Sequence, residues 1–268
     1  MFAGGCGGAT PAADSAPAPA GTTPAVQTPT GGPSDSPSPS ARSSGRSLAG
    51  AVVALDPGHN GGNGAHPEII NRQVDAGTLE KACDTTGAET NAGYAEAAFA
   101  FDVAKRLARR LRARGIRVVL TRKTNSGVGP CITRRAAIGN RANADAALSI
   151  HADGGPAGGR GFHVIEPASI PGYTAAIAPA SHRLALRIRS AFRAGTGQPY
   201  ATYIGSAGLD TRDDLGGLNL STVPKIFVEC GNIRNATDAA RLSDPAFRER
   251  VAAALETGLV RFLRKHTE

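Results

Sequence analysis

The chain has 268 residues, of which 41% are hydrophobic and 19% charged, a composition that fits one sizeable globular domain with additional segments. The net charge of +8 falls entirely on residues 49–268, because the four charged residues before them sum to zero. A basic domain favours anionic partners such as nucleic acid, anionic lipid or a wall polymer, although a basic surface can also be unspecialised. With 4% aromatic residues the chain lacks the stacking surface of a nucleic-acid binder, so no nucleic acid is expected as a partner.

Residues 1–48 predict a tether rather than a folded domain. The start MFAGGCGG resembles the end of a bacterial lipoprotein signal, after whose cleavage Cys6 would carry a lipid; on this interpretation the natural chain begins further upstream. A chance cluster of Gly and Cys is the alternative. Residues 7–48 are rich in Pro, Ser and Ala and cannot bury enough surface to offset their ordering entropy, so a disordered tether is expected.

From residue 50 onward, strand and helix patterns alternate. In the helix predicted over 96–115, Phe99, Val103, Leu107 and Leu111 recur every four residues on one face, and Arg and Lys occupy the other. The alternation predicts an α/β domain over 49–268 with a mainly parallel sheet that helices cover on both faces. The predicted strands are 51–56, 116–121, 146–151, 161–166 and 225–229, and the other predicted helices are 133–144, 181–195 and 244–265.

Polar residues fall where the predicted strands end. His59 follows the first strand in LDPGHNGG, His151 ends ALSIH, and Glu229 ends KIFVE, while Glu96 opens the long helix on its sheet-facing side. Ligands of open α/β sheets bind beyond these strand ends, so the four side chains can converge. Two His and one carboxylate make a catalytic zinc set with a fourth position for water, and a second carboxylate can take that water's proton.

Each of these four residues also has an ordinary structural explanation. His59 could be a loop histidine, His151 a hydrogen-bonding residue at a strand end, Glu96 a charge at a helix start and Glu229 half of a salt bridge. The ligands are scattered in sequence, unlike those of a helix-borne H-E-x-x-H motif, so their spacing alone does not decide the question.

Five segments of the chain carry a family resemblance. They are similar, in order, to the zinc-dependent N-acetylmuramoyl-L-alanine amidases (the amidase-3 family), especially the compact mycobacterial-type members: LDPGHNGG, EAAFAFDVAKRL, VVLTR, RRAAIGNRANADAALSIHAD and VPKIFVECGNIRN. The resemblance covers about residues 50–265 and implies a twisted mixed sheet flanked by helices. It also implies one zinc ion held by His59, Glu96 and His151, with Glu229 as the catalytic glutamate.

The resemblance implies a reaction as well. The family hydrolyses the amide between the lactyl group of N-acetylmuramic acid and L-alanine of the peptidoglycan stem peptide, with a zinc-held water. Glu229 would deprotonate this water and return the proton to the alanine nitrogen. Two departures concern the pocket: Gly231-Asn232 stands where many relatives have Gly-Phe, and Cys230 adjoins Glu229. Asn235 matches a family Asn and is expected to fix a turn.

Further candidate residues lie outside this set. His163 and Asp153 are alternative metal ligands, since Asp153 follows His151 by two residues on an extended chain. Arg134, Arg135 and Arg141 are expected on a solvated helix face, with contact to substrate carboxylates as the second interpretation. His66 is expected to be structural.

The cysteines predict an oxidising compartment. Cys83 and Cys131 could pair outside the cytoplasm, as compact relatives also imply, and closing a loop of roughly 50 residues would stabilise the fold by roughly 2–4 kcal/mol. A metal role for these two cysteines is the alternative. Cys83 would pin the long polar loop 60–95, which is interpreted as one wall of the substrate groove. Cys230 is expected to be a buried free thiol.

Together these features predict a monomeric zinc amidase of bacterial peptidoglycan, an autolysin acting in the periplasm or cell wall and either secreted or anchored through a lipid on Cys6. Three alternatives remain at this point. The first is a zinc peptidase or deacetylase acting on another wall bond, and the second is a non-catalytic wall-binding module. The third is a binder of anionic polymers that uses the charge of +8.

Overall fold

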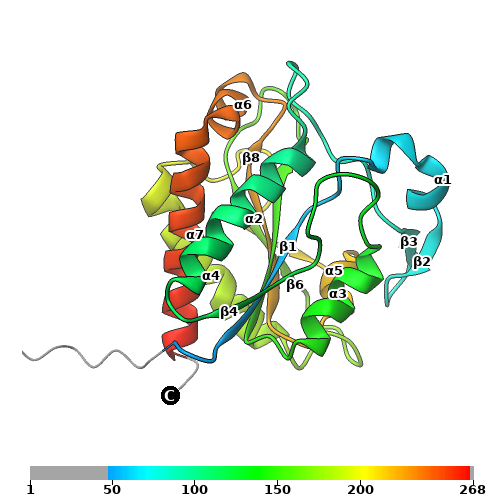
Figure 1. Ribbon diagram of the computed structural model, residues 1–268, viewed down its shortest axis with the longest axis vertical. Coiled ribbons are helices and arrows are strands. Elements are labelled where there is room, and N and C mark those ends of the chain that lie inside the picture. The colour runs from blue at the N-terminus through cyan, green and yellow to red at the C-terminus, as the bar shows by residue number, and fades with distance from the viewer. Residues whose placement is uncertain (1–47, 266–268) are drawn as a thin grey trace, which may run out of the picture. The chain divides into compact units, whose positions relative to one another are not determined.

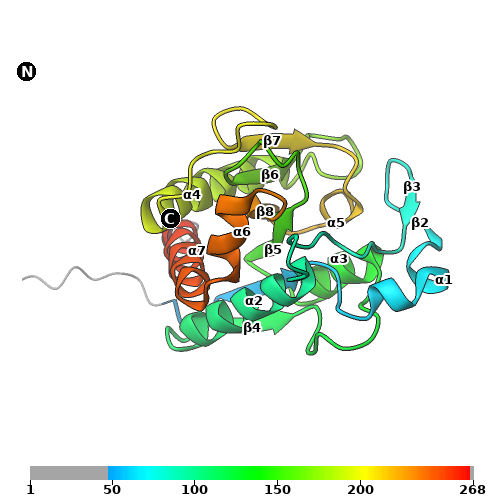
Figure 2. The same cartoon turned by 90° about the horizontal axis from the view of Figure 1, so that it is seen from above.

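The computed structural model describes residues 48–265, which form a six-stranded sheet between two layers of helices (Figures 1 and 2). Cys6 and nearly all of the predicted tether lie outside these residues. Within this six-stranded sheet, all neighbouring strands are parallel except one pair. The predicted α/β class with a mostly parallel mixed sheet is therefore confirmed. The strands lie in the order β4 (Arg117–Leu120), β1 (Val52–Pro57), β5 (Ala146–Asp153), β8 (Lys225–Asn232), β6 (His163–Pro167) and β7 (Leu209–Arg212), with β6 antiparallel to β8.

Helices cover both faces of the sheet. One face carries α2 (Glu96–Arg112), α4 (Ala178–Thr196) and α7 (Pro245–Lys265), and the other carries α3 (Ile132–Arg141) and α5 (Gly216–Asn219). Strand β1 shows why two layers are needed, because successive side chains of a strand point to opposite faces. Val53 and Leu55 join the large core under α2, α4 and α7, whereas Val52 and Ala54 join a smaller core on the opposite face.

Helix α2 carries the predicted apolar stripe, since Phe99, Val103, Leu107 and Leu111 are fully buried. The prediction placed the end of this helix at residue 115, but the helical segment ends three residues earlier. The chain leaves α2 through a turn in which Gly115 has a φ of +79°. Glycine adopts this left-handed conformation without steric penalty. Gly115 therefore closes the turn that follows the helix and is not itself the last helical residue.

Several short elements escape the sequence patterns, because three or four residues do not establish a period. Residues 60–95, predicted as one loop, contain a one-turn helix and a small hairpin. The helix α6, with its predicted turn residue Asn235 as N-cap, was also missed; the Asn235 side chain accepts hydrogen bonds from two backbone N–H groups of its first turn. The additional elements are η1 (Asn63–Ala65), α1 (Pro67–Ile70), β2 (Gln73–Asp75), β3 (Glu80–Ala82), β7 and α5 above, and α6 (Ala236–Ser243).

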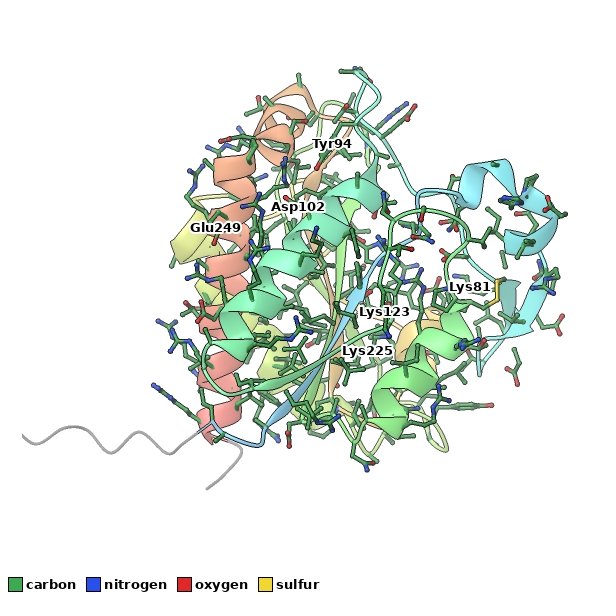
Figure 3. All side chains as sticks on the ribbon, viewed as in Figure 1. Lys81, Tyr94, Asp102, Lys123, Lys225 and Glu249 are labelled. Carbon is green, nitrogen blue, oxygen red and sulfur yellow. A yellow bond between two sulfur atoms is a disulfide. The ribbon has the colours of Figure 1, made fainter. Side chains whose placement is uncertain are left out.

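Cys83 and Cys131 form a disulfide, the pairing that the resemblance implied, with their Cα atoms 4.5 Å apart. The bond ties the segment after β3 to the residue that precedes α3, and Figure 3 shows it beside Lys81. Cys230 is a buried free thiol among the described residues, as expected. The disulfide and the free thiol therefore lie in different parts of the domain. The disulfide lies at the N-terminal end of α3, and the thiol lies in the large hydrophobic core.

A buried ion cluster joins β1, β8 and α3 beneath the carboxyl edge of the sheet. Asp56 is 4% exposed and accepts from Lys225 Nζ at 3.0 Å and from Arg135 Nη1 at 3.0 Å. Thr121 donates a further hydrogen bond to Asp56 at 2.7 Å. Burial alone would raise the pKa of Asp56, but the charges of Lys225 and Arg135 hold this pKa well below its ordinary value.

The position of Arg135 corrects the sequence interpretation, which put it on a solvated face with Arg134 and Arg141. Those two arginines are exposed, but Arg135 is 5% exposed. Its charge is compensated by two carboxylates, Asp56 and Asp84, each 3.0 Å away. A guanidinium can be buried when its planar set of donors is satisfied in this way.

Replacing Asp56 by Asn should destabilise the fold by about 3–5 kcal/mol at pH 7, because Lys225 would lose the one carboxylate that pairs with it among the described residues and Arg135 would lose one of its two. The pKa of Asp56 is lower in the folded chain than its ordinary value of 3.8, so its contribution is present above about pH 4 and is lost as the pH falls. Urea unfolding at pH 7 and pH 3 measures both effects. The exposed Asp213→Asn is the control, and equal stabilities of the two variants at pH 7 would contradict the prediction.

Candidate active site

The carboxyl ends of β1, β5 and β8 meet at one edge of the sheet and border a cavity of about 480 Å³. The parallel pairing explains this meeting, because the carboxyl ends of neighbouring parallel strands lie at the same edge of the sheet. His151 on β5 is paired with Glu229 on β8, and the cavity is lined by both of them and by His59 and Glu96. The four residues singled out from the sequence therefore lie around one space.

His59 follows β1 in a turn that only a glycine at position 58 permits. The backbone N–H of Gly58 donates to the carbonyl of Ile150 at 3.0 Å, which draws the turn against β5. A Cβ atom on Gly58 would lie 2.3 Å from the His151 ring. His59 itself has a φ of +53°, a left-handed conformation that is uncommon for histidine. The glycine thus lets the two imidazoles approach, and their ring centres lie 5.0 Å apart.

Glu96 sits between the two histidines. Its Oε1 atom lies 2.8 Å from His151 Nδ1 and 3.2 Å from His59 Nε2. Its Oε2 atom accepts the backbone N–H of Ala88 at 2.8 Å, and Oε1 also accepts that of Ala152 at 3.2 Å. The carboxylate is 4% exposed at the first turn of α2, where the helix dipole favours negative charge. The two backbone N–H groups fix the direction of the Glu96 carboxylate, because backbone donors move less than long side chains do.

The donor set fits a metal ion. His59, Glu96 and His151 each offer one ligand atom, and these atoms lie within 4.8 Å of one another. Two imidazoles and one carboxylate are a usual protein ligand set for catalytic Zn²⁺. Burial would lower the pKa of His59, but attraction to Glu96 and the hydrogen bond to Asp84 raise this pKa to about 10. Burial would raise the pKa of Glu96, but His59 and His151 hold it below its ordinary value. The lowered pKa of Glu96 keeps its carboxylate ionised and therefore available as an anionic ligand.

Glu229 faces the same cavity from the neighbouring strand. Its Oε2 atom is buried and has no hydrogen-bond partner among residues 48–265. Burial and the negative charges of Glu96 and Asp153 raise the pKa of Glu229 well above its ordinary value. A raised pKa and an unpaired oxygen atom are features that proton transfer requires. Glu229 is therefore a candidate general acid and base rather than half of a structural ion pair.

His163 and Asp153, the alternative ligands, lie in the cavity wall but outside the group of three converging side chains. His163 is paired with Glu229 across the antiparallel strands and is buried, and burial lowers its pKa. His66, expected to be structural, pairs with the exposed Glu68 at 3.1 Å and does not line this cavity. Among the candidates from the sequence, the structure therefore gathers His59, Glu96, His151 and Glu229.

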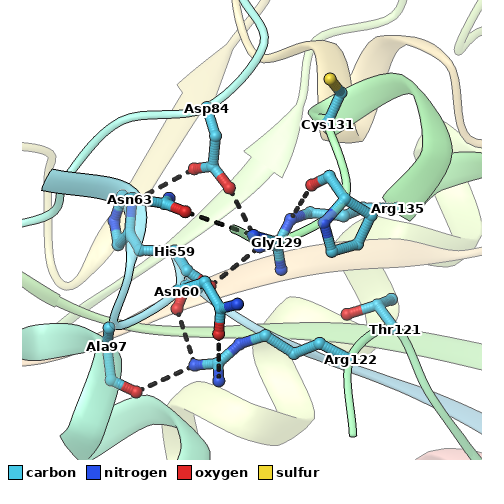
Figure 4. Close-up of polar contacts among 12 residues, drawn as sticks. His59, Asn60, Asn63, Asp84, Ala97, Thr121, Arg122, Gly129, Cys131 and Arg135 are labelled. Carbon is cyan, nitrogen blue, oxygen red and sulfur yellow. Dashed lines mark hydrogen bonds and ion pairs between the residues drawn. The ribbon is translucent and has the colours of Figure 1, made fainter. Parts of the chain in front are cut away.

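Two residues that support His59 were not foreseen from the sequence. Asp84 lies 3.4 Å from His59 Nδ1 (Figure 4). Arg122 donates to the carbonyls of Pro57 and Gly58 at 3.0 and 3.1 Å. The only available signal for Asp84 was its place directly after Cys83. No local pattern marks Arg122, which belongs to the site because β4 lies beside β1.

Comparison with known proteins gives the site a context. The chain is 43% identical over 217 residues to an N-acetylmuramoyl-L-alanine amidase of Mycobacterium tuberculosis, a match that spans 81% of this chain and 88% of that protein. The structure of the N-acetylmuramyl-L-alanine amidase Ami1 from Mycobacterium smegmatis superposes with a TM-score of 0.77 at 42% identity, covering 81% of this chain and 99% of that one. Ami1 from Mycobacterium abscessus gives a TM-score of 0.75 at 43% identity, covering 80% and 99%.

A more distant structure shares the fold alone. The amidase AmiC2 of Nostoc punctiforme has a TM-score of 0.59 at 24% identity and covers 80% of this chain and 97% of that one. At the level of the family, residues 53–261 match the description N-acetylmuramoyl-L-alanine amidase (Amidase_3). This range contains all four side chains that surround the cavity. The protein belongs to the Amidase_3 family of N-acetylmuramoyl-L-alanine amidases.

Proposed function

We propose that the domain 49–268 is a zinc-dependent N-acetylmuramoyl-L-alanine amidase, which hydrolyses the amide between N-acetylmuramic acid and L-alanine in bacterial peptidoglycan. The observation that carries this proposal is the convergence of His59, Glu96 and His151 with the unpaired carboxyl of Glu229 in one cavity. Membership of the amidase family supports the choice of this bond over the other wall bonds that a metal hydrolase could cleave.

His59 Nε2, Glu96 Oε1 and His151 Nδ1 would hold the metal, since these are the atoms that face one another. Bound Zn²⁺ lowers the pKa of a water molecule to about 7 and polarises a carbonyl oxygen. The backbone N–H groups of Ala88 and Ala152 keep the Glu96 carboxylate in place, so the ligand set needs little rearrangement.

Glu229 would move the protons of the reaction. Its Oε2 atom has no other partner within the described chain, so it can accept the proton of the attacking water and return it to the leaving alanine nitrogen. Its raised pKa suits the second step, in which a carboxylic acid must donate. His151 and His163 flank Glu229 from the paired positions of the two neighbouring strands.

The location of this activity follows from the substrate, since peptidoglycan lies outside the cytoplasm. The Cys83–Cys131 disulfide agrees with an oxidising compartment. Within residues 48–265, no helix is long and apolar enough to cross the bilayer. The lipid on Cys6, the tether over residues 1–48 and the monomeric state remain predictions, which mass spectrometry of the natural protein and sedimentation can test.

Glu229→Gln should lower the rate of muramyl tripeptide cleavage by at least about 10²-fold, because the amide cannot shuttle a proton. Mass spectrometry of the released peptide, with its free L-alanine amino terminus, measures the rate. Zinc content should stay that of the parent protein, since Glu229 is outside the ligand set. Glu80→Gln, at an exposed residue of β3, is the matched control. A Glu229→Gln variant with the parent's rate would remove Glu229 from the mechanism.

Removing the metal should abolish cleavage reversibly. Dialysis against a chelator should leave the protein folded but inactive, and one equivalent of Zn²⁺ should restore the rate. His59→Ala and Glu96→Gln should each bind less than one zinc per chain, as measured by elemental analysis, because each removes one of three ligand atoms. Cleavage that persists in the chelated protein would rule out the zinc mechanism.

A further inference from the structure

Two buried arginines hold the turn that carries His59. Arg135 donates to the carbonyl oxygens of Pro57 and His59, each at 2.8 Å. Arg122 donates to the carbonyl oxygens of Pro57 and Gly58. Three successive carbonyls are thus bound by side chains from outside the turn, at a residue whose left-handed φ needs such support. The backbone of the proposed ligand is fixed from α3 and from the end of β4.

The ring of His59 is fixed from the other direction, by Asp84. One carboxylate oxygen of Asp84 binds Arg135 Nη2 at 3.0 Å. The other lies 3.4 Å from His59 Nδ1 and accepts the backbone N–H of Thr85 at 2.8 Å. That bond places the Thr85 carbonyl oxygen 3.1 Å from the same ring nitrogen. His59 Nδ1 therefore faces oxygen atoms of Asp84 and Thr85, an arrangement that favours a hydrogen on Nδ1, while Nε2 is directed towards Glu96.

The disulfide joins the two halves of this arrangement. Asp84 follows Cys83 directly, and Arg135 lies one helical turn after Cys131, to whose carbonyl its backbone N–H donates at 3.0 Å. The N–H of Ile132 also donates to the carbonyl of Cys83 at 2.8 Å. The disulfide and this hydrogen bond therefore hold the backbones next to Asp84 and Arg135 close together, where the two side chains form their ion pair.

We propose that Asp84 is a positioning residue for His59, and that Arg135 and the Cys83–Cys131 disulfide hold it in that role. The proposal rests on the proposed function, because it treats His59 as a metal ligand. Asp84 touches neither the cavity around Glu229 nor the other two ligands. Its effect should therefore appear in how tightly the metal is held. Outer partners of metal-bound histidines typically change metal affinity by about 10–100-fold when they are removed.

The test measures the Zn²⁺ dissociation constant of the purified full chain by competition with a chromogenic chelator. Asp84→Asn keeps the size of the side chain but loses its charge, and the affinity should fall by about 10–100-fold. Asp75→Asn is the matched control, because Asp75 is an exposed aspartate of the same loop 60–95 that is hydrogen-bonded within its own turn, to the backbone N–H of Gly77. Its affinity should stay within about 3-fold of the parent's. Equal losses in both variants would overturn the proposal, since the effect would then be general loosening.

The contribution of the disulfide is measured in the same way. The double variant Cys83→Ser, Cys131→Ser should also bind Zn²⁺ more weakly, and Asp84→Asn should add little to it. Unchanged affinity in the double variant would remove the disulfide from the proposal, and unchanged affinity in Asp84→Asn would overturn it. The variant His59→Ala distinguishes failure of this proposal from failure of the proposed function. If the parent protein binds no Zn²⁺, or if His59→Ala binds Zn²⁺ as tightly as the parent, the assignment of the metal site itself is wrong.

Discussion

The buried guanidinium of Arg135 is the interaction on which the rest of this structure depends. It neutralises Asp56 in the sheet and Asp84 in the loop, and it binds the carbonyls of the turn before and at His59. A charge taken out of water at this depth is tolerable only when its donors are satisfied, so the loss of any one of these contacts is costly. Arg135 therefore links three parts of the structure through its charge and hydrogen bonds: the sheet at Asp56, the loop 60–95 at Asp84 and the turn at His59.

The candidate site collects its chemistry from four separate elements. His59 follows β1, Glu96 opens α2, His151 ends β5 and Glu229 lies near the end of β8. Parallel strands that end at one edge explain how residues 170 positions apart in sequence (from 59 to 229) come to share a cavity. The arrangement needs no local motif, and rigidity comes from backbone hydrogen bonds to Glu96 and from the register of β5 and β8.

The sequence was informative wherever a side chain's position follows from the period of its own element. The stripe of α2 predicted both its buried face and the inward direction of Glu96, and strand ends predicted the meeting of His59, His151 and Glu229. It failed where the position depends on distant partners. Arg135 looked like a surface residue because the carboxylates that allow its burial lie about 50 and 80 residues earlier in the chain. The antiparallel direction of β6 and the hairpin β2–β3 depend on tertiary pairing that short patterns do not encode.

Cys230 has a consequence for oxidative folding. Its thiol is fully buried in the core, and burial together with the charges of Glu229 and Glu96 raises its pKa well above the ordinary value. Attack on a disulfide requires an accessible thiolate, so the folded chain cannot exchange Cys230 with Cys83 or Cys131. Wrong pairing of Cys230 is therefore confined to chains in which β8 has not yet joined the sheet. Docking of β8 before the cysteines are oxidised would protect the native cross-link from this thiol.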